Sequence, residues 1–153
     1  TFLDEPLTGG ERSKARPTPE LLRALLERAK HHGRLTTKFP ALTSTIERSE
    51  PGTLTHYRGF SATLAEVFRF EAEDVLVFHV RLQNHGATAI AYDRDVLAVR
   101  VGPDVHVAAI TDASGAIPAM ATTHVYFAIT GGLHGGRANL PIGEAFNLIV
   151  PHA

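Results

Sequence analysis

The sequence VLVFHVRLQ, residues 75–83, alternates between two kinds of position along its whole length. One side of the alternation is entirely apolar and consists of Leu76, Phe78, Val80 and Leu82. The other side carries Val75, Val77, His79, Arg81 and Gln83. Because successive side chains of a β-strand point to opposite faces, a period of two predicts a strand with one face in the core. The residues that follow, Asn84-His85-Gly86, favour a turn.

Further short stretches of strand-forming composition flank this one on both sides. They lie at residues 35–39, 43–47, 54–58, 63–71, 88–92, 96–101, 105–111, 124–130 and 144–150. Turn-forming residues separate most of them, at a spacing of roughly 8–12 residues that is typical of antiparallel sandwiches and barrels. We therefore expect a mainly β fold, namely an antiparallel immunoglobulin-like β-sandwich.

One amphipathic helix is expected before the sandwich, over residues 18–32. Thr18 is a suitable N-cap, and Pro19 suits the first helical position. Apolar side chains recur at three- and four-residue spacing and form one stripe, made of Leu21, Leu22, Leu25, Leu26 and Ala29. Gly33 is a fitting C-terminal stop. We expect the stripe to cover a face or an edge of the sheet.

The composition excludes several classes of protein. The chain has 153 residues, 44% of them hydrophobic and 20% charged, and it contains no Cys. Without Cys there is no disulfide, no Cys-ligated metal and no Cys nucleophile. The formal net charge of −1 argues against a general binder of nucleic acid or anionic membranes, because such binders carry a basic excess. No apolar run approaches the ~20 residues of a membrane span.

Charge and composition also divide the chain. Residues 1–17 carry charges, Gly and Pro with little apolar periodicity, which is typical of a flexible arm or linker. Residues 18–153 are expected to form a single β-sandwich domain that includes the helix. Residues 1–58 hold ten basic and seven acidic side chains, whereas residues 59–153 hold five basic and nine acidic ones. We expect the helix to dock on the sandwich with electrostatic help, although apolar contact must supply most of the energy.

The nine histidines raise the question of a metal site. No HxH or HExxH spacing is present, so the usual metal motifs are absent. His79, His106 and His124 alternate with apolar neighbours and could meet on an outer sheet face, but nothing in the sequence makes their strands adjacent. We expect unrelated surface histidines, and we predict neither a metal site nor a cofactor.

The glycine-rich segment GGLHGGR, residues 131–137, is the first candidate for a binding loop. Neither a Lys-Ser/Thr pair nor a helix follows it, so it fails the P-loop and dinucleotide fingerprints. We expect a mobile hairpin loop whose contacts to a protein partner come from Gly131, Gly132, His134 and Arg137. Phe146 and Leu148, in the last predicted strand, are further contact candidates, because an exposed sheet edge can accept a strand from a neighbour.

A family pattern runs through residues 74–102, DVLVFHVRLQNHGATAIAYDRDVLAVRVG, in which a strand ending in Asn is followed by a short turn, a Tyr-Asp and a further strand. Its positions are occupied by Phe78, Leu82, Asn84, Tyr92, Asp93 and Val99-Arg100. In this pattern the chain resembles the β-rich domain of conjugative-transposon TraN proteins, with the match clearest over residues 75–102. His85-Gly86 departs from the Ser-type turn expected after the Asn. The resemblance implies a non-catalytic, exported or periplasmic subunit of a bacterial cell-envelope or conjugation assembly.

Three functions remain open. The first is a non-catalytic structural or interaction domain with protein partners or self-association. The alternative is a carbohydrate- or small-ligand-binding module, which needs exposed aromatic side chains such as Tyr57, Tyr92 or Tyr126. The third is a histidine-dependent metalloenzyme on a β-barrel. Because no serine lies in a GxSxG context and no carboxylate pair is identifiable from spacing, we predict no catalytic residue and favour the first.

Overall fold

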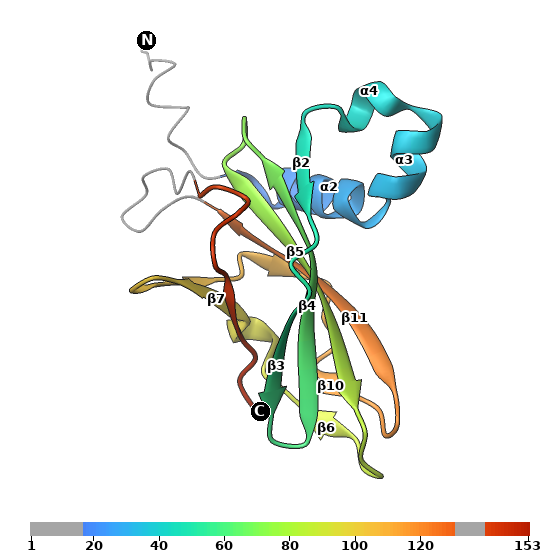
Figure 1. Ribbon diagram of the computed structural model, residues 1–153, viewed down its shortest axis with the longest axis vertical. Helices are drawn as coiled ribbons and strands as arrows, with labels where there is room; N and C mark the ends of the chain where they lie inside the picture. The colour runs from blue at the N-terminus through green and yellow to red at the C-terminus, as the bar shows by residue number, and fades with distance from the viewer. Residues whose placement is uncertain (1–16, 131–139) are drawn as a thin grey trace.

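The computed structural model describes residues 17–130 and 140–153 (Figure 1). It confirms a mainly β, antiparallel sandwich preceded by an amphipathic helix. The arm predicted over residues 1–17 lies outside the described residues, apart from Pro17. The same holds for four of the predicted contact residues, which are Gly131, Gly132, His134 and Arg137.

The helical part consists of α2 (Pro19–Lys30), α3 (His32–Lys38) and α4 (Pro40–Thr43). α2 begins as predicted, because Thr18 Oγ1 accepts a hydrogen bond from the Leu21 N–H at 3.2 Å. It ends at Lys30, two residues earlier than predicted, and the chain turns at His31 into α3.

The strand predicted over residues 35–39 is wrong, because most of these residues belong to α3. The Thr36 and Thr37 hydroxyls donate to the carbonyls of His32 and Gly33, at 2.8 and 3.1 Å. Such bonds back to the preceding turn satisfy β-branched residues inside a helix. Gly33, predicted as the C-terminal stop of the first helix, lies inside α3. The strand predicted over 43–47 begins only at Ile46.

A long antiparallel sheet forms the centre of the described part of the chain, with the strand order β2-β4-β5-β11-β9. Its strands are β2 (Ile46–Ser49), β4 (Phe60–Phe70), β5 (Val75–Asn84), β11 (Thr122–Thr130) and β9 (Ile110–Thr111). β3 (Thr53–Tyr57) also pairs with β4, so β2 and β3 share one edge of that long strand. We call this the main sheet.

Two smaller sheets form the other layer of the sandwich. The first has the order β12-β7-β8, with β12 (Asn147–Ile149), β7 (Ala98–Val101) and β8 (Asp104–Val107). The second pairs β6 (Ile90–Ala91) with β10 (Ala116–Ile117), and the 3-10 turn η1 (Arg94–Val96) connects β6 to β7. Several strands of the chain are shorter than predicted. Residues 88–92 contribute only β6, and residues 105–111 are divided between β8 and β9, the latter a strand of the main sheet.

A β-bulge interrupts β4 between Leu64 and Glu66. Before the bulge Leu64 pairs with Val80, and after it Glu66 pairs with His79. The extra residue, Ala65, reverses the alternation of the strand, because a shift of one residue moves every later side chain to the opposite face. The side chains that share a face with His79 are therefore Ser61 and Thr63 before the bulge and Glu66, Phe68 and Phe70 after it.

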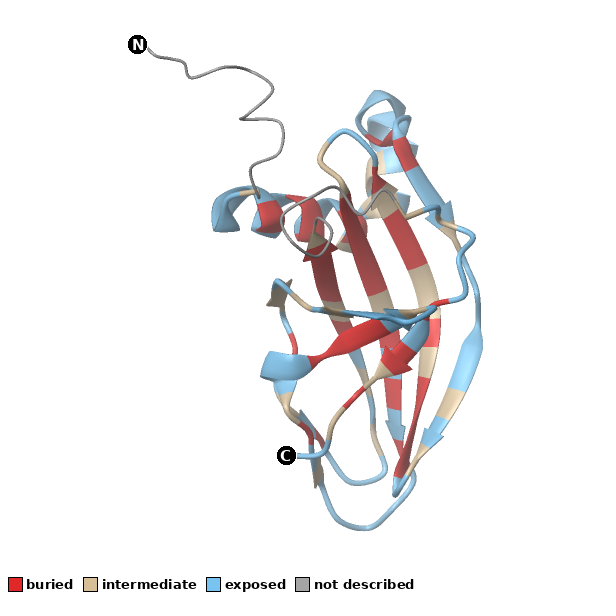
Figure 2. Ribbon diagram, turned by 90° about the vertical axis from the view of Figure 1, so that its left-hand side faces the viewer, coloured by how far each residue is buried: buried red, intermediate tan, exposed pale blue. Residues whose placement is uncertain are grey.

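Two clusters of buried side chains hold the described residues together. The larger lies between the main sheet and the smaller sheets and contains the predicted apolar face of β5, namely Leu76, Phe78, Val80 and Leu82. The other lies between the opposite sheet face and α2, and joins Leu22, Leu25, Leu26 and Ala29 to Phe68, Phe70, Val75, Val77 and Ala128. Figure 2 shows the buried residues along the central strands and on part of α2. The apolar stripe of α2 thus covers a face of the main sheet, which is one of the two predicted positions, and not an edge.

The docking of α2 has an electrostatic component, as expected. Lys30 Nζ lies 2.8 Å from Asp112 Oδ2, and this hydrogen-bonded ion pair raises the pKa of Lys30. Both side chains are between a quarter and a third exposed, so the pair contributes about 1 kcal/mol or less. Burying a leucine contributes about 1.5–3 kcal/mol, and α2 buries three of them. Apolar contact therefore dominates the docking.

Candidate functional site: a histidine pair and a cationic cleft

The outer face of the main sheet changes from apolar to polar along its length. Beneath α2 it carries the paired row Phe68, Val77 and Ala128. One step farther from the helix the row is Glu66, His79 and Tyr126, and the next is Thr63, Arg81 and His124. The bulge at Ala65 produces this arrangement, because it turns Glu66 outward beside His79 while Val67 stays in the larger core.

A chain of hydrogen bonds links the polar side chains of this face. His79 Nδ1 lies 2.6 Å from Glu66 Oε1, and His79 Nε2 lies 2.9 Å from His124 Nδ1. Arg48 Nε donates to Glu66 Oε2 at 2.8 Å from the neighbouring strand β2. The Tyr126 ring is stacked on the His79 ring, with centroids 4.4 Å apart and an interplanar angle of 7°. We call Glu66, His79 and His124 the histidine chain.

The charges of this chain follow from burial and from the hydrogen bonds. Burial lowers the pKa of His79 and outweighs the opposite effect of the Glu66 carboxylate. Burial alone would raise the pKa of Glu66, but the hydrogen bonds from His79 and Arg48 hold it below its ordinary value. At neutral pH Glu66 is therefore ionised and His79 is neutral. Neutral His79 donates from Nδ1 to Glu66 and accepts at Nε2, so His124 donates from Nδ1.

The structure brings together two of the three histidines that were candidates for a shared face. His79 and His124 meet on adjacent strands, whereas His106 lies on β8 opposite Val99. The sequence analysis did not predict that Glu66 joins them. Its outward direction depends on the bulge in β4, and no local sequence motif indicates that bulge. Among the described residues, no group of three or more His, Cys, Asp or Glu side chains is placed to hold a metal ion.

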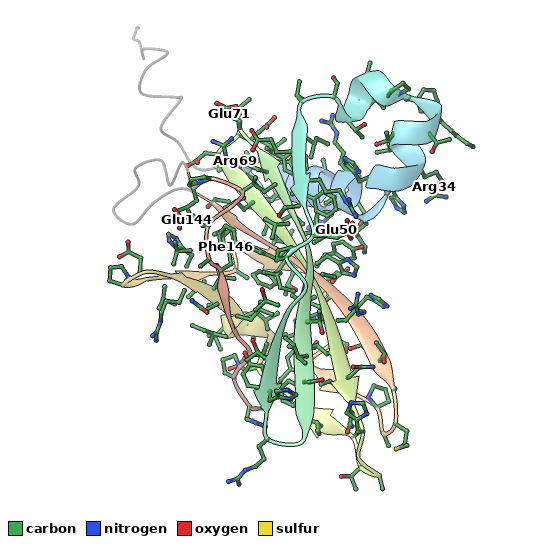
Figure 3. All side chains as sticks on the ribbon, in the orientation of Figure 1. Arg34, Glu50, Arg69, Glu71, Glu144 and Phe146 are labelled. Carbon is green, nitrogen blue, oxygen red and sulfur yellow. The ribbon has the colours of Figure 1, made fainter. Side chains whose placement is uncertain are left out.

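A second feature is a cleft of about 380 Å³ between α2 and α3. It is lined by Ala24, Glu27, Arg28, His31, Arg34, Leu35, Lys38 and Phe39. Arg34 lies on α3, with its guanidinium 2.6 Å from His31 Nδ1 (Figure 3). The acidic lining residue, Glu27, is already close to Lys30 at 3.7 Å and to His31 at 3.3 Å. The cleft therefore combines apolar walls with an excess of positive charge.

The side chains of the two described contact candidates of the last strand, Phe146 and Leu148, lie in the core, while β12 itself is an edge strand of its small sheet. Phe146 is 5% exposed, and its ring meets the Phe78 ring edge-on at 5.0 Å (Figure 3). Leu148 is buried in the same cluster, and its carbonyl accepts a hydrogen bond from the Tyr57 hydroxyl at 2.9 Å. β12 packs over the main sheet, and the alternation of the strand points both Phe146 and Leu148 toward that sheet. They are not exposed for contact with a partner.

None of the three tyrosines that a stacking platform would need is exposed. Tyr92 is buried in the larger core, and Tyr57 packs against Phe60 with ring centroids 5.0 Å apart. Tyr126 is stacked on His79 of the histidine chain and is half-buried.

Within the described ranges no helix is long and apolar enough to cross a membrane.

No family model matches the chain, and no curated protein matches it. A functionally unknown protein from Listeria monocytogenes EGD-e is similar in structure at 8% sequence identity, with a TM-score of 0.41, over 76% of this chain and 93% of that one. The resemblance to TraN proteins stays a prediction.

Proposed function

We propose that this protein is a non-catalytic interaction domain that binds an acidic segment of a partner protein in the cleft between α2 and α3. The cleft is the observation that carries the proposal, because it joins apolar walls to a cationic rim. Partner segments that dock on such surfaces place apolar anchors in the groove and complementary charges around it.

The apolar part of the argument concerns the exposure of the helical projection. Phe39 is 56% exposed and Leu42 48%, and the described residues of α3 include no buried side chain. A helix this short is not stable on its own and depends on packing. Exposed aromatic and aliphatic side chains beside a groove are typical of a surface that a partner covers.

The electrostatic part concerns the sign of the rim. Arg28, Arg34 and Lys38 surround the apolar walls, and the carboxylate of Glu27 is engaged by its own neighbours. An acidic segment gains from these cations, whereas a basic segment is repelled by them. The resemblance to TraN proteins adds the expectation that the partner is another component of a bacterial cell-envelope or conjugation assembly and that the chain is exported.

The test is a fluorescence-anisotropy titration with three designed peptides of equal length. One is amphipathic and acidic, one has the same apolar residues with basic charges, and one is acidic without apolar residues. We expect binding only of the first. Arg34→Glu and Phe39→Ala should each weaken it at least tenfold, while Arg58→Glu, an exposed site on the far end of the main sheet, should leave it unchanged. Equal binding of the acidic and basic peptides, or no binding of either, would overturn the proposal.

A further inference from the structure

We propose that His79 and His124 bind one divalent transition-metal ion of the zinc or copper class, oriented by Glu66. The proposal is independent of the cleft and rests on the histidine chain alone. Two ring nitrogens from adjacent strands, His79 Nε2 and His124 Nδ1, face each other at 2.9 Å on the outer face of the main sheet.

The spacing of the two nitrogens suits a shared ion. A tetrahedral zinc ion with bonds of about 2.0–2.1 Å to nitrogen separates two ligand atoms by about 3.3 Å. The histidine nitrogens therefore need to part by a few tenths of an ångström. One ring must also turn, because the two nitrogens now point at each other and not at a common point beside them. His124 is exposed, so its ring can make this turn without disturbing the core. The ion takes the place of the His124 Nδ1 proton, which is released to solvent, and neutral His124 then carries its single proton on Nε2.

His79 is held in the orientation that a ligand needs. Its Nδ1 is bonded to Glu66 at 2.6 Å, the Glu66 carboxylate is bonded to Arg48 at 2.8 Å, and Tyr126 is stacked on the ring. A metal-bound histidine usually donates its other N–H to a carboxylate, which fixes the tautomer and strengthens the ligand.

The chemistry of the donors selects the class of ion. Two imidazole nitrogens suit zinc, copper and nickel, whereas calcium and magnesium require oxygen ligands. Since the described residues hold no third metal-binding side chain at this point, water completes the coordination. Arg81 lies beside His124 in the sheet register, and its positive charge reduces the affinity without removing either ligand.

The experiment is isothermal titration of the tag-free, chelator-treated full chain with zinc sulfate, copper chloride and magnesium chloride. We expect one zinc or copper ion per chain and no magnesium binding. His124→Ala, at an exposed position, should abolish this event, as should His79→Ala. Glu66→Gln should weaken it by about tenfold or more, as is found for partners of metal-bound histidines. The matched control is His56→Ala, an exposed histidine on β3, which should change nothing.

Two results would overturn the proposal. One is the absence of zinc and copper binding to the unaltered chain. The other is binding of unchanged stoichiometry and affinity in His124→Ala, because the ion would then be held by other histidines. Circular dichroism of His79→Ala and Glu66→Gln shows whether they fold, and His124→Ala carries the test on its own because its side chain is exposed.

Discussion

Asn84 is the buried polar residue whose replacement tests the fold most directly. It ends β5 with 2% of its surface exposed. Its Nδ2 donates to the carbonyls of Thr88, Ile117 and Pro118 at 2.9, 3.1 and 3.2 Å, and its Oδ1 accepts from the Gly86 N–H at 2.9 Å. The side chain thereby connects the turn after β5 to the end of β10 and to Pro118, the residue that follows it.

The cost of removing this side chain can be worked from its bonds. Nδ2 has two hydrogens for its three carbonyl partners, and Oδ1 accepts from the Gly86 N–H, so Asn84→Ala breaks three hydrogen bonds. At about 1 kcal/mol each, the expected loss is about 3 kcal/mol of the free energy of unfolding. That is a large share of the ~5–15 kcal/mol typical of a domain. Asn84→Asp should lose more at pH 7, because a buried carboxylate would face carbonyl oxygens.

Urea denaturation provides the measurement, since the midpoint shifts while the slope stays constant when only stability changes. Asn147→Ala, at an exposed position of β12, is the matched control and should shift the free energy by about 0.5 kcal/mol or less. A loss below ~1 kcal/mol in Asn84→Ala would refute the bond-by-bond reasoning. So would an Asn84→Asp variant as stable at pH 7 as the unaltered chain.

Two further predictions concern charge. The pKa of His79 lies below its unfolded value, so the unfolded chain takes up a proton first and stability should fall as the pH drops through about 6.5. The pKa of Glu66 is also lowered, so a second loss should follow as the pH falls below about 4.5. In His79→Gln, urea denaturation should show no first loss and a smaller second loss, because Arg48 still bonds to Glu66 but the hydrogen bond from His79 is gone. Asp112→Asn keeps the Oδ1 that accepts from the Tyr126 N–H at 2.8 Å but loses the charge pair with Lys30. Its free energy of unfolding should drop by less than ~1 kcal/mol, whereas Asp112→Ala should lose more, and equal losses in the two variants would contradict this assignment.

The sequence prediction was accurate where local spacing carries the information. The strand over residues 75–83 and both of its faces are confirmed, as is the start of α2. Its apolar stripe is confirmed for Leu22, Leu25, Leu26 and Ala29, whereas Leu21 is exposed. It was wrong over residues 35–39, where composition favoured a strand. The threonines there satisfy their hydroxyls on the preceding helical turn, and composition alone does not distinguish that outcome from a strand.

The burial of the side chains in the last strand could not be predicted from the sequence. Phe146 and Leu148 were contact candidates because the last strand was expected to present an exposed sheet edge, and β12 does lie at the edge of its small sheet. Their side chains point into the sandwich because β12 covers the main sheet, which depends on how the two layers pack. The cleft was missed for the same kind of reason, since its cations come from two helices where the sequence indicated one helix and a strand.

Local periodicity was thus enough to specify β5 and its two faces, and the helix α2 with most of its apolar stripe. Those features depend on contacts between residues two to four positions apart, so the sequence carries them locally. The histidine chain depends on tertiary structure instead. Glu66 meets His79 across 13 residues and His79 meets His124 across 45, and both contacts require the strand order of the main sheet together with one bulge in β4. Pairing between distant strands and a one-residue shift in register are decided by the packing of the whole sheet, because only the packed core favours one register over another.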